Sequence, residues 1–318
     1  MRGRQATSVE RPDADGVAGT DHNIEKSNIV MQEIKSYLAP RSLHEAVKAM
    51  AAGDVTVVCG GTDLTPQTAS GVRRYAATLM NIRRIEGLSG IAEAGDDIRI
   101  GALTTVAEIR HDPLVARVAP ILAEAAEHFA SDQIRNAASL GGNLCNGSPA
   151  GDMSIPLLVL DAAVELASWE DGAMRTRSVP LDTFFLGPGR IVKRPEELLT
   201  AIVFRKPAAD FVAHFRKSGP RPALEISTVS VGVGGELREG MFSNVRVAMG
   251  AVAPTPLRAR NVEAALEGNR LGADSIRAAV SAVAADARPI DDVRASAWYR
   301  AHLARVFTEE SLNHVLGN

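Results

Sequence analysis

Two short stretches of the sequence each carry a pair of adjacent glycines followed by a small polar residue. The first is VVCGGTDL at residues 57–64, and the second is SLGGN at residues 139–143. Glycine permits a positive φ and lets another group approach the backbone, because it has no Cβ. Successive backbone N–H groups that turn into one concavity bind anions without a charged side chain. Two such turns facing each other predict a site for a diphosphate.

Each glycine pair also has a simpler explanation. A single Gly-Gly pair after a strand is more often only a tight turn. Neither pair fits the G-x-G-x-x-G fingerprint of dinucleotide-binding folds, because in neither does that pattern follow a strand and open a helix. The run GVGG at 232–235 is closer in letters, but the ELREG that follows it predicts a turn. The repetition of one design favours a ligand over two unrelated turns.

Other groups that could do chemistry are scattered along the chain. His44-Glu45 is followed by Ala-Val-Lys rather than by the spacing of a zinc site, and Glu45 is placed to cap a helix. His128 ends a predicted helix, where it would interact favourably with the helix C-terminus. The Arg-rich stretches at 73–84 and 256–260 predict solvated faces or contacts with acidic partner subunits. No side chain is therefore predicted to be catalytic, and no cluster is predicted to bind a metal.

The composition limits the classes of protein that fit. The chain has 318 residues, of which 46% are hydrophobic and 23% charged, as in a globular protein of two domains. A net charge of −3 and only 4% aromatic residues argue against nucleic-acid binding. Cys59 and Cys145 are too few for an iron–sulfur cluster or a structural zinc site, and they favour the reducing cytoplasm. No apolar run reaches the ~20 residues of a membrane span.

Hydrophobic patterning predicts a first domain over residues 31–206, after a polar and disordered extension at 1–30. Pro207 marks its end. The expected elements are a helix at 42–53, strands at 55–59 and 78–82, a hairpin at 91–103, a long helix from Asp112-Pro113 to about Phe129, a loop at 137–152, a short buried helix at 155–162, a hairpin at 163–179 and a segment at 196–204 that closes the domain.

Residues 207–318 predict a second domain of the α+β class. Three strand-like runs come first, and helices follow them. This order indicates a three-stranded antiparallel sheet with helices packed on it. The strands are expected at 211–218, 226–233 and 245–252, and the helices are expected to begin near Thr255-Pro256, Ser275 and Ser296.

The sequence around both glycine pairs resembles a known family. VVCGGTDL (57–64) and QIRNAASLGGNLCNGSPAGDMSIPLLVLDA (133–162) are similar to the paired flavin-binding segments of the medium subunit of molybdenum hydroxylases. That family includes xanthine dehydrogenase, carbon monoxide dehydrogenase and 4-hydroxybenzoyl-CoA reductase. The resemblance continues through VRVAMGAVAPTPLRARNVEAALEG (245–268) and ASAWYRAHLARV (295–306). It covers roughly residues 31–315.

The resemblance implies that FAD lies extended between two lobes of the first domain. The backbone of Gly60-Gly61-Thr62 would cradle the diphosphate, and Ser139 and Asn143 would bond phosphate or ribityl oxygens. Asp152 would direct a carboxylate at the cofactor, and Lys217 would place a cation near the ring. The residues that match the family's cofactor contacts are Val57, Val58, Cys59, Gly60, Gly61, Thr62, Asp63, Leu64, Phe129, Ala130, Ser139, Leu140, Gly141, Gly142, Asn143, Asp152, Leu199 and Lys217.

The same resemblance implies a fold and a set of partners. The fold would be α+β, with a two-lobed PCMH-type FAD-binding domain at 31–206 and a carbon monoxide dehydrogenase flavoprotein-like domain at 207–318. Electrons would leave a molybdopterin centre on a large subunit and pass through [2Fe–2S] clusters on a small subunit to this FAD. An external acceptor would then take them from a heterotrimer or its dimer. Two alternatives stay open: a stand-alone flavin oxidoreductase of the wider superfamily, and an assembly scaffold without flavin.

Overall fold

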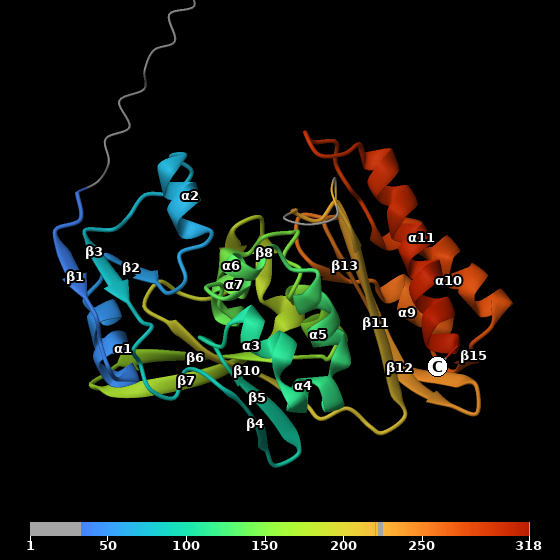
Figure 1. Cartoon of the computed structure of the whole chain (residues 1–318), viewed down its shortest axis with the longest axis horizontal. Helices are drawn as coiled ribbons and strands as arrows, with labels where there is room; N and C mark the ends of the chain where they lie inside the picture. Colours follow the sequence, from blue (N-terminus) through green and yellow to red (C-terminus); the bar gives the residue numbers. More distant parts are fainter. Residues whose placement is uncertain (1–32, 220, 222–224, 318) are drawn as a thin grey trace, which may run out of the picture. The chain divides into compact units, whose positions relative to one another are not determined.

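The computed structural model describes residues 33–219, 221 and 225–317, so the disordered extension expected at 1–30 lies outside it. A small parallel sheet forms the first lobe, at the left in Figure 1. The helix α1 (Leu43–Ala51) connects its first two strands, and α2 (Leu64–Ala69) leads from the second strand to the third. The sheet has the strand order β1 (Ser36–Leu38), β3 (Thr78–Asn81), β2 (Val55–Val58).

A second, fully antiparallel sheet forms the middle of the chain. Its two outer hairpins turn at Gly95-Asp96 and at Asp171-Gly172, as the alternating sequence pattern predicted. The strand contributed by residues 198–205 runs between them and is almost wholly buried. The strand order is β4 (Ile91–Ala94), β5 (Asp97–Gly101), β10 (Leu198–Arg205), β6 (Ala163–Glu170), β7 (Ala173–Pro180).

Short helices and one small hairpin connect the strands of the second sheet. The long helix predicted from Pro113 to about Phe129 is wrong, because the chain breaks at Ala119. Pro120 restricts the residue before it to an extended backbone and cannot donate a helical hydrogen bond. The connecting elements are α3 (Val106–His111), α4 (Pro113–Val118), α5 (Pro120–Glu127), α6 (Asp132–Arg135), α7 (Leu140–Asn146), α8 (Ser154–Val159), the 3-10 helix η1 (Leu181–Thr183), β8 (Phe185–Gly187) and β9 (Arg190–Ile191).

The helix α7 replaces part of the loop that the sequence predicted at 137–152. Ser139 caps it, because its hydroxyl accepts a hydrogen bond from the Gly142 N–H at 3.1 Å. Gly147 ends it with a positive φ of 61°. Helix propensity does not predict this helix, because two glycines stand near its start and glycine is a poor helix former.

The third sheet lies in the C-terminal part of the chain. Its three long strands were predicted, although the second begins at Val229 rather than at Ile226 and runs on to Arg238. Two short strands, which were not predicted, extend it to five. The sheet comprises β11 (Phe211–Ser218), β12 (Val229–Arg238), β13 (Met241–Gly250), β14 (Leu257–Arg258) and β15 (Asn269–Arg270), and β14 and β15 both pair with β13.

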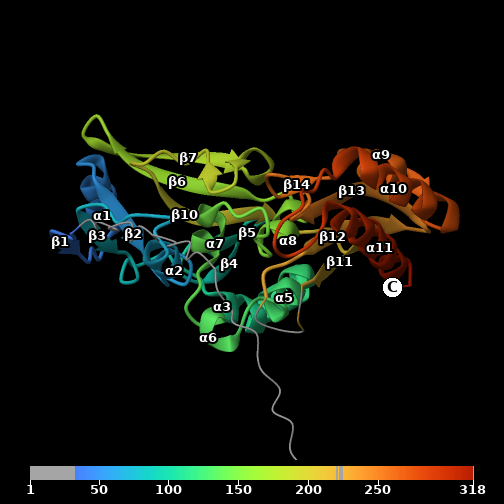
Figure 2. The ribbon, with the colours of Figure 1, turned by 90° about the horizontal axis from the view of Figure 1, so that it is seen from above.

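Helices cover one face of this third sheet, and α5 and α8 pack against it from the middle of the chain (Figures 1 and 2). The helix expected near Thr255-Pro256 begins only at Arg260, because Leu257 and Arg258 first pair with β13. The C-terminal helices are α9 (Arg260–Leu266), α10 (Ala273–Asp286) and α11 (Ala297–Leu316).

Candidate cofactor-binding site

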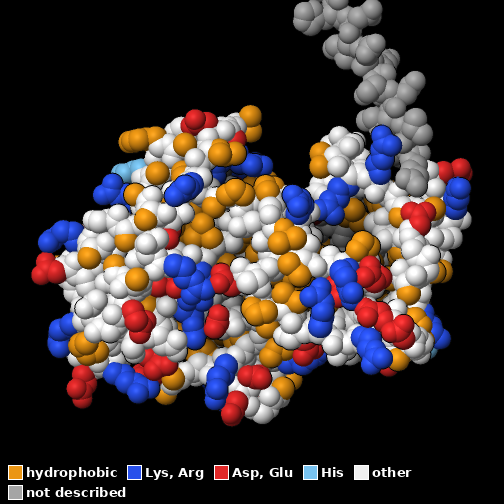
Figure 3. Space-filling view, turned by 180° about the vertical axis from the view of Figure 1, so that it is seen from behind, with side chains coloured by type: hydrophobic (Ala, Val, Ile, Leu, Met, Phe, Trp, Pro, Cys, Tyr) orange, Lys and Arg blue, Asp and Glu red, His pale blue; other side chains and the backbone are white. Residues whose placement is uncertain are grey.

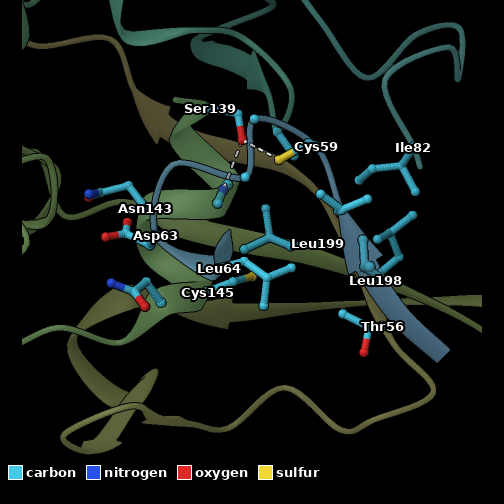
Figure 4. Close-up of a pocket in the computed structure, with 18 of the residues that line it drawn as sticks. Thr56, Cys59, Asp63, Leu64, Ile82, Ser139, Asn143, Cys145, Leu198 and Leu199 are labelled. Atoms are coloured by element: carbon cyan, nitrogen blue, oxygen red, sulfur yellow. Dashed lines mark hydrogen bonds between the residues drawn. The ribbon is translucent and has the colours of Figure 1, made fainter. Parts of the chain in front are cut away.

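A cavity of about 380 Å³ opens between the small parallel sheet and the second sheet. The turn after β2 forms one of its sides and α7 another, so the fold brings the two glycine segments together (Figure 4). Fourteen of the eighteen residues predicted to contact the cofactor line it: Val57, Val58, Cys59, Gly60, Gly61, Thr62, Asp63, Leu64, Phe129, Ser139, Gly141, Gly142, Asn143 and Leu199.

The turn after β2 lies directly against the chain that leads into α7. A Cβ on Gly60 would fall 1.9 Å from the carbonyl oxygen of Ala137, so only glycine fits there. Gly61 has a φ of +70°, in the region that favours glycine. Gly60 therefore makes room for the protein's own backbone, and not for a ligand as its sequence pattern had suggested.

The two turns differ in the hydrogen-bond donors that they leave free. Within the described part of the chain, no acceptor takes the N–H groups of Gly60, Gly61 and Thr62. The N–H groups at the start of α7 are all used: that of Gly141 donates to the Ala102 carbonyl at 2.8 Å, and that of Gly142 to the Ser139 hydroxyl. The prediction of two facing sets of free donors is thus wrong for the second turn, and only the first can bind an anion through its backbone.

Close packing also explains the second glycine pair. A Cβ on Gly141 would fall 2.8 Å from the Cβ and the carbonyl oxygen of Ala102. A Cβ on Gly142 would fall 2.8 Å from the Ser139 hydroxyl, which itself lies 3.0 Å from the Cys59 thiol. Figure 4 shows this Cys59–Ser139 contact as a dashed line between the two segments. The glycines of α7 let the helix approach its neighbours.

Asn143 offers a further polar group at the cavity. Its side-chain oxygen is buried and has no hydrogen-bond partner within the described residues. A buried acceptor without a partner costs free energy, so native proteins rarely leave one unpaired. Asn143 lines the same cavity as Gly60, Gly61 and Thr62. A ligand that carries both an anionic group and hydroxyl donors, as a flavin dinucleotide does, fits these two sets of groups.

Charged side chains at the cavity were largely missed by the sequence analysis. Arg73 and Arg74 are exposed, as predicted for a solvated face, but they also line the cavity. Lys193 lines it as well. Burial raises the pKa of Asp63, and the positive charge of Arg73 opposes that shift. The only sequence signal was the position of the two arginines shortly after a glycine turn and a short helix.

Glu197 also lines the cavity, but its charge is neutralised inside the protein. Burial alone would raise the pKa of its carboxyl group. The Arg177 guanidinium and the Arg194 N–H both bind the carboxylate, and together with the charges of these arginines they lower its pKa to about 2. Glu197 therefore does not repel an anionic guest as strongly as an unpaired carboxylate would.

Four predicted residues do not line the cavity: Ala130, Leu140, Asp152 and Lys217. Leu140 is fully buried in the core. Ala130 follows Phe129 with a φ of +39°. The Lys217 ammonium lies 2.7 Å from the Asp152 carboxylate, and both side chains are almost wholly buried. Burial raises the pKa of Asp152, while the Lys217 charge opposes that shift.

Comparison with known proteins identifies the family. Residues 31–206 match the family model described as the FAD binding domain in molybdopterin dehydrogenase, and residues 213–315 match the CO dehydrogenase flavoprotein C-terminal domain. The chain belongs to this family of FAD-binding medium subunits of molybdenum hydroxylases. The resemblance stated from the two glycine segments is confirmed, as are the α+β fold and FAD as the cofactor.

Individual relatives match along nearly their whole length. The xanthine dehydrogenase FAD-binding subunit of Escherichia coli is 33% identical over 290 residues, which is 90% of this chain and 97% of that protein. The glyceraldehyde dehydrogenase medium chain of Sulfolobus acidocaldarius is 30% identical and covers 88% and 98% of the two chains. A solved structure of carbon monoxide dehydrogenase from Hydrogenophaga pseudoflava superposes with a TM-score of 0.84 at 30% identity, covering 91% of this chain and 99% of that one.

The described residues include neither a metal-binding cluster nor a membrane-spanning helix. No group of three or more His, Cys, Asp or Glu side chains among them is arranged to hold a metal ion. None of the described helices is both long and apolar enough to cross a membrane.

Proposed function

We propose that this chain is the electron-transfer subunit of a molybdenum hydroxylase complex. It would take electrons from the [2Fe–2S] clusters of a small partner subunit and pass them to an external acceptor. The observation that carries this proposal is the cavity between the two glycine segments. It combines the free N–H groups of residues 60–62 with the unpaired acceptor of Asn143.

The residues of the cavity have separate roles in this proposal. FAD, when bound, supplies chemistry that can exchange electrons singly or in pairs. Gly60, Gly61 and Thr62 donate their N–H groups to its diphosphate. Asn143 accepts a hydrogen bond from a hydroxyl of the cofactor. The apolar side chains of Phe129 and Leu199 pack against it and exclude water. No side chain of this chain has to move a proton.

We further propose that Ala130, Asp152 and Lys217 lie at the ring end of the cofactor. Their support is the resemblance, together with the buried Lys217–Asp152 ion pair, which places an ammonium group and its counter-charge in the interior of the protein. Leu140 is left out of the contacts, because its side chain packs in the core and its N–H donates to the Thr104 carbonyl.

The partners are also a proposal. Relatives of this chain are named as medium chains or FAD subunits of dehydrogenases. We propose a large molybdopterin subunit and a small [2Fe–2S] subunit, joined with this chain in a heterotrimer or its dimer. The free thiols Cys59 and Cys145 fit a reducing cytoplasm. The boundary between the two domains is proposed at residues 206 and 207, between the end of β10 and the start of β11.

The test first uses the full-length chain purified alone. It then uses the chain purified together with the products of the neighbouring genes. We expect a yellow protein with one FAD per chain. Its absorbance near 450 nm should bleach when the reduced [2Fe–2S] partner is added. A colourless protein that cannot take up FAD would support the scaffold alternative. A chain that oxidises an organic substrate without any partner would support the stand-alone oxidoreductase.

A further inference from the structure

Two consecutive arginines border the cavity on the side of α2. The chain leaves α2 at Ala69, and the Arg73 N–H donates back to the Gln67 carbonyl at 3.1 Å, which fixes the turn that carries both side chains. Arg73 and Arg74 are exposed to solvent, and both line the cavity. Seen from behind, Lys and Arg side chains border the hollow in the surface beside the first lobe (Figure 3).

These two arginines form no ion pair with the described residues, although the charge of Arg73 acts on Asp63. Neither guanidinium has a carboxylate within 4.0 Å in the part of the chain that the structure describes. Other arginines of the described chain are paired, such as Arg177 with Glu197. Lys193 donates to the carbonyls of Arg194 and Glu197, at 2.9 Å each, and forms no ion pair with the described residues. Among the described residues that line the cavity, Arg73, Arg74 and Lys193 form no ion pair, and neither does the Asp63 carboxylate.

The Arg73 side chain lines the cavity and extends toward the turn between β8 and β9. A Cβ built on Gly189 would lie 3.8 Å from its Nη2 atom, so the side chain reaches from the end of α2 to the turn between β8 and β9. Burial raises the pKa of Cys145 to about 11, and the charges of Lys193 and Arg73 oppose that shift. The positive charges of Lys193 and Arg73 thus both act on the Cys145 thiol, which lines the cavity.

We propose that Arg73 and Arg74 form an anion site for the diphosphate of FAD. This rests on the proposed function and adds to it the counter-charge that the backbone donors of residues 60–62 lack. A diphosphate ester carries two negative charges at neutral pH, and the two guanidinium groups match them. Guanidinium groups bind phosphate oxygens through paired hydrogen bonds. The diphosphate then lies between the first glycine turn and the end of α2.

The test compares two double variants of the full-length chain after its flavin has been removed. The first is Arg73→Gln with Arg74→Gln. The second, Arg83→Gln with Arg84→Gln, makes the same change in charge at exposed residues that do not line the cavity. FAD and uncharged riboflavin are titrated into each by flavin fluorescence, at low salt and at 0.5 M salt (roughly a 4 Å screening length).

We expect a loss of affinity only for the Arg73→Gln/Arg74→Gln variant, and only for FAD. Kd for FAD rises about ten- to hundredfold in Arg73→Gln/Arg74→Gln, a range set by the loss of hydrogen bonds to a charged group. Its Kd for riboflavin stays at the wild-type value, and the difference for FAD narrows at 0.5 M salt. The Arg83→Gln/Arg84→Gln variant binds both ligands as the wild type does.

Three results would overturn the assignment. One is an unchanged Kd for FAD in the first variant. Another is an equal loss of FAD and riboflavin affinity, which would show a structural role. The third is normal FAD affinity with slower reduction of the bound flavin by NADH, which would show that the arginines bind NADH rather than FAD. Failure of the wild-type chain to bind FAD would instead refute the proposed function.

Discussion

A Cβ on Gly60 would fall 1.9 Å from the carbonyl oxygen of Ala137. This contact joins the turn after β2 to the chain that enters α7, and the Cys59 thiol lies 3.0 Å from the Ser139 hydroxyl beside it. The two glycine segments thus touch each other directly. The shape of the cavity depends on that contact, because both segments line it.

Gly60→Ala should therefore damage both stability and cofactor binding. The added methyl group has to push the Ala137 backbone away, and overpacking of this kind costs about 1–3 kcal/mol. We expect a lower melting temperature and at least tenfold weaker FAD binding, measured by thermal unfolding and by flavin fluorescence. Gly187→Ala is the matched control, because nothing lies within 4 Å of its added Cβ. Equal behaviour of the two variants would contradict the account.

The buried ion pair between Asp152 and Lys217 should contribute more to the free energy of unfolding than an exposed ion pair on the same strand. Asp152→Ala leaves the Lys217 charge unpaired in the interior, which costs about 3–5 kcal/mol of the free energy of unfolding. Glu310→Ala breaks the exposed Arg216–Glu310 pair, whose side chains are 50% and 47% exposed, and should cost less than about 1 kcal/mol. Urea unfolding of both flavin-free variants measures the difference. A loss for Asp152→Ala as small as that for Glu310→Ala would contradict it.

His214 should make stability depend on pH in the mildly acidic range. Burial lowers its pKa from 6.5 to about 4, with a smaller effect from the charge of His314, whose ring stacks on it at 4.0 Å. The unfolded chain therefore binds a proton between pH 6.5 and pH 4 that the folded chain does not. The contribution of His214 to the free energy of unfolding is fully present above pH 6.5 and is lost as the pH falls toward 4.

The measurement is the free energy of unfolding of wild type and His214→Gln at several pH values between 4.5 and 8. We expect the variant to lose less stability than the wild type across that range. His302→Gln serves as the control, because it makes the same substitution at an exposed histidine. If His214→Gln keeps the wild-type slope, the histidine is not held neutral by its surroundings.

The two cysteines should report on occupancy of the cavity. Both line it, but burial raises the pKa of Cys145 to about 11, so at pH 8 almost none of it is the reactive thiolate. We expect iodoacetamide to modify Cys59 first in the flavin-free chain, and FAD to protect it, as read by mass spectrometry of peptides. Faster labelling of Cys145, or labelling of Cys59 unaffected by FAD, would speak against a cofactor in this cavity.

Much of the fold was predictable because its signals are local. The hairpins at 91–101 and 163–180 show alternating apolar residues around a turn, and the helix after Ser42 has its cap. The break at Ala119 could have been seen, since Pro120 stands inside the expected helix. The helix α7 could not, because its stability comes from the Ser139 cap and from packing against Ala102 rather than from helix propensity.

In the candidate site, too, some features follow from local sequence and others depend on tertiary structure. The residue types of both glycine segments predicted that they would meet around one ligand, and fourteen of the eighteen predicted residues share the cavity. Which backbone donors remain free could not be predicted. The N–H of Gly141 is consumed by the Ala102 carbonyl, a contact between distant parts of the chain. The placement of Arg73 and Arg74 at the cavity likewise depends on tertiary structure.

A crystal structure of the full-length chain with bound FAD tests the central claim most directly. We predict that the FAD diphosphate lies within hydrogen-bond distance of the N–H groups of Gly60, Gly61 and Thr62, in the turn after β2. A diphosphate bound elsewhere, with these three N–H groups turned to other acceptors, would contradict the account.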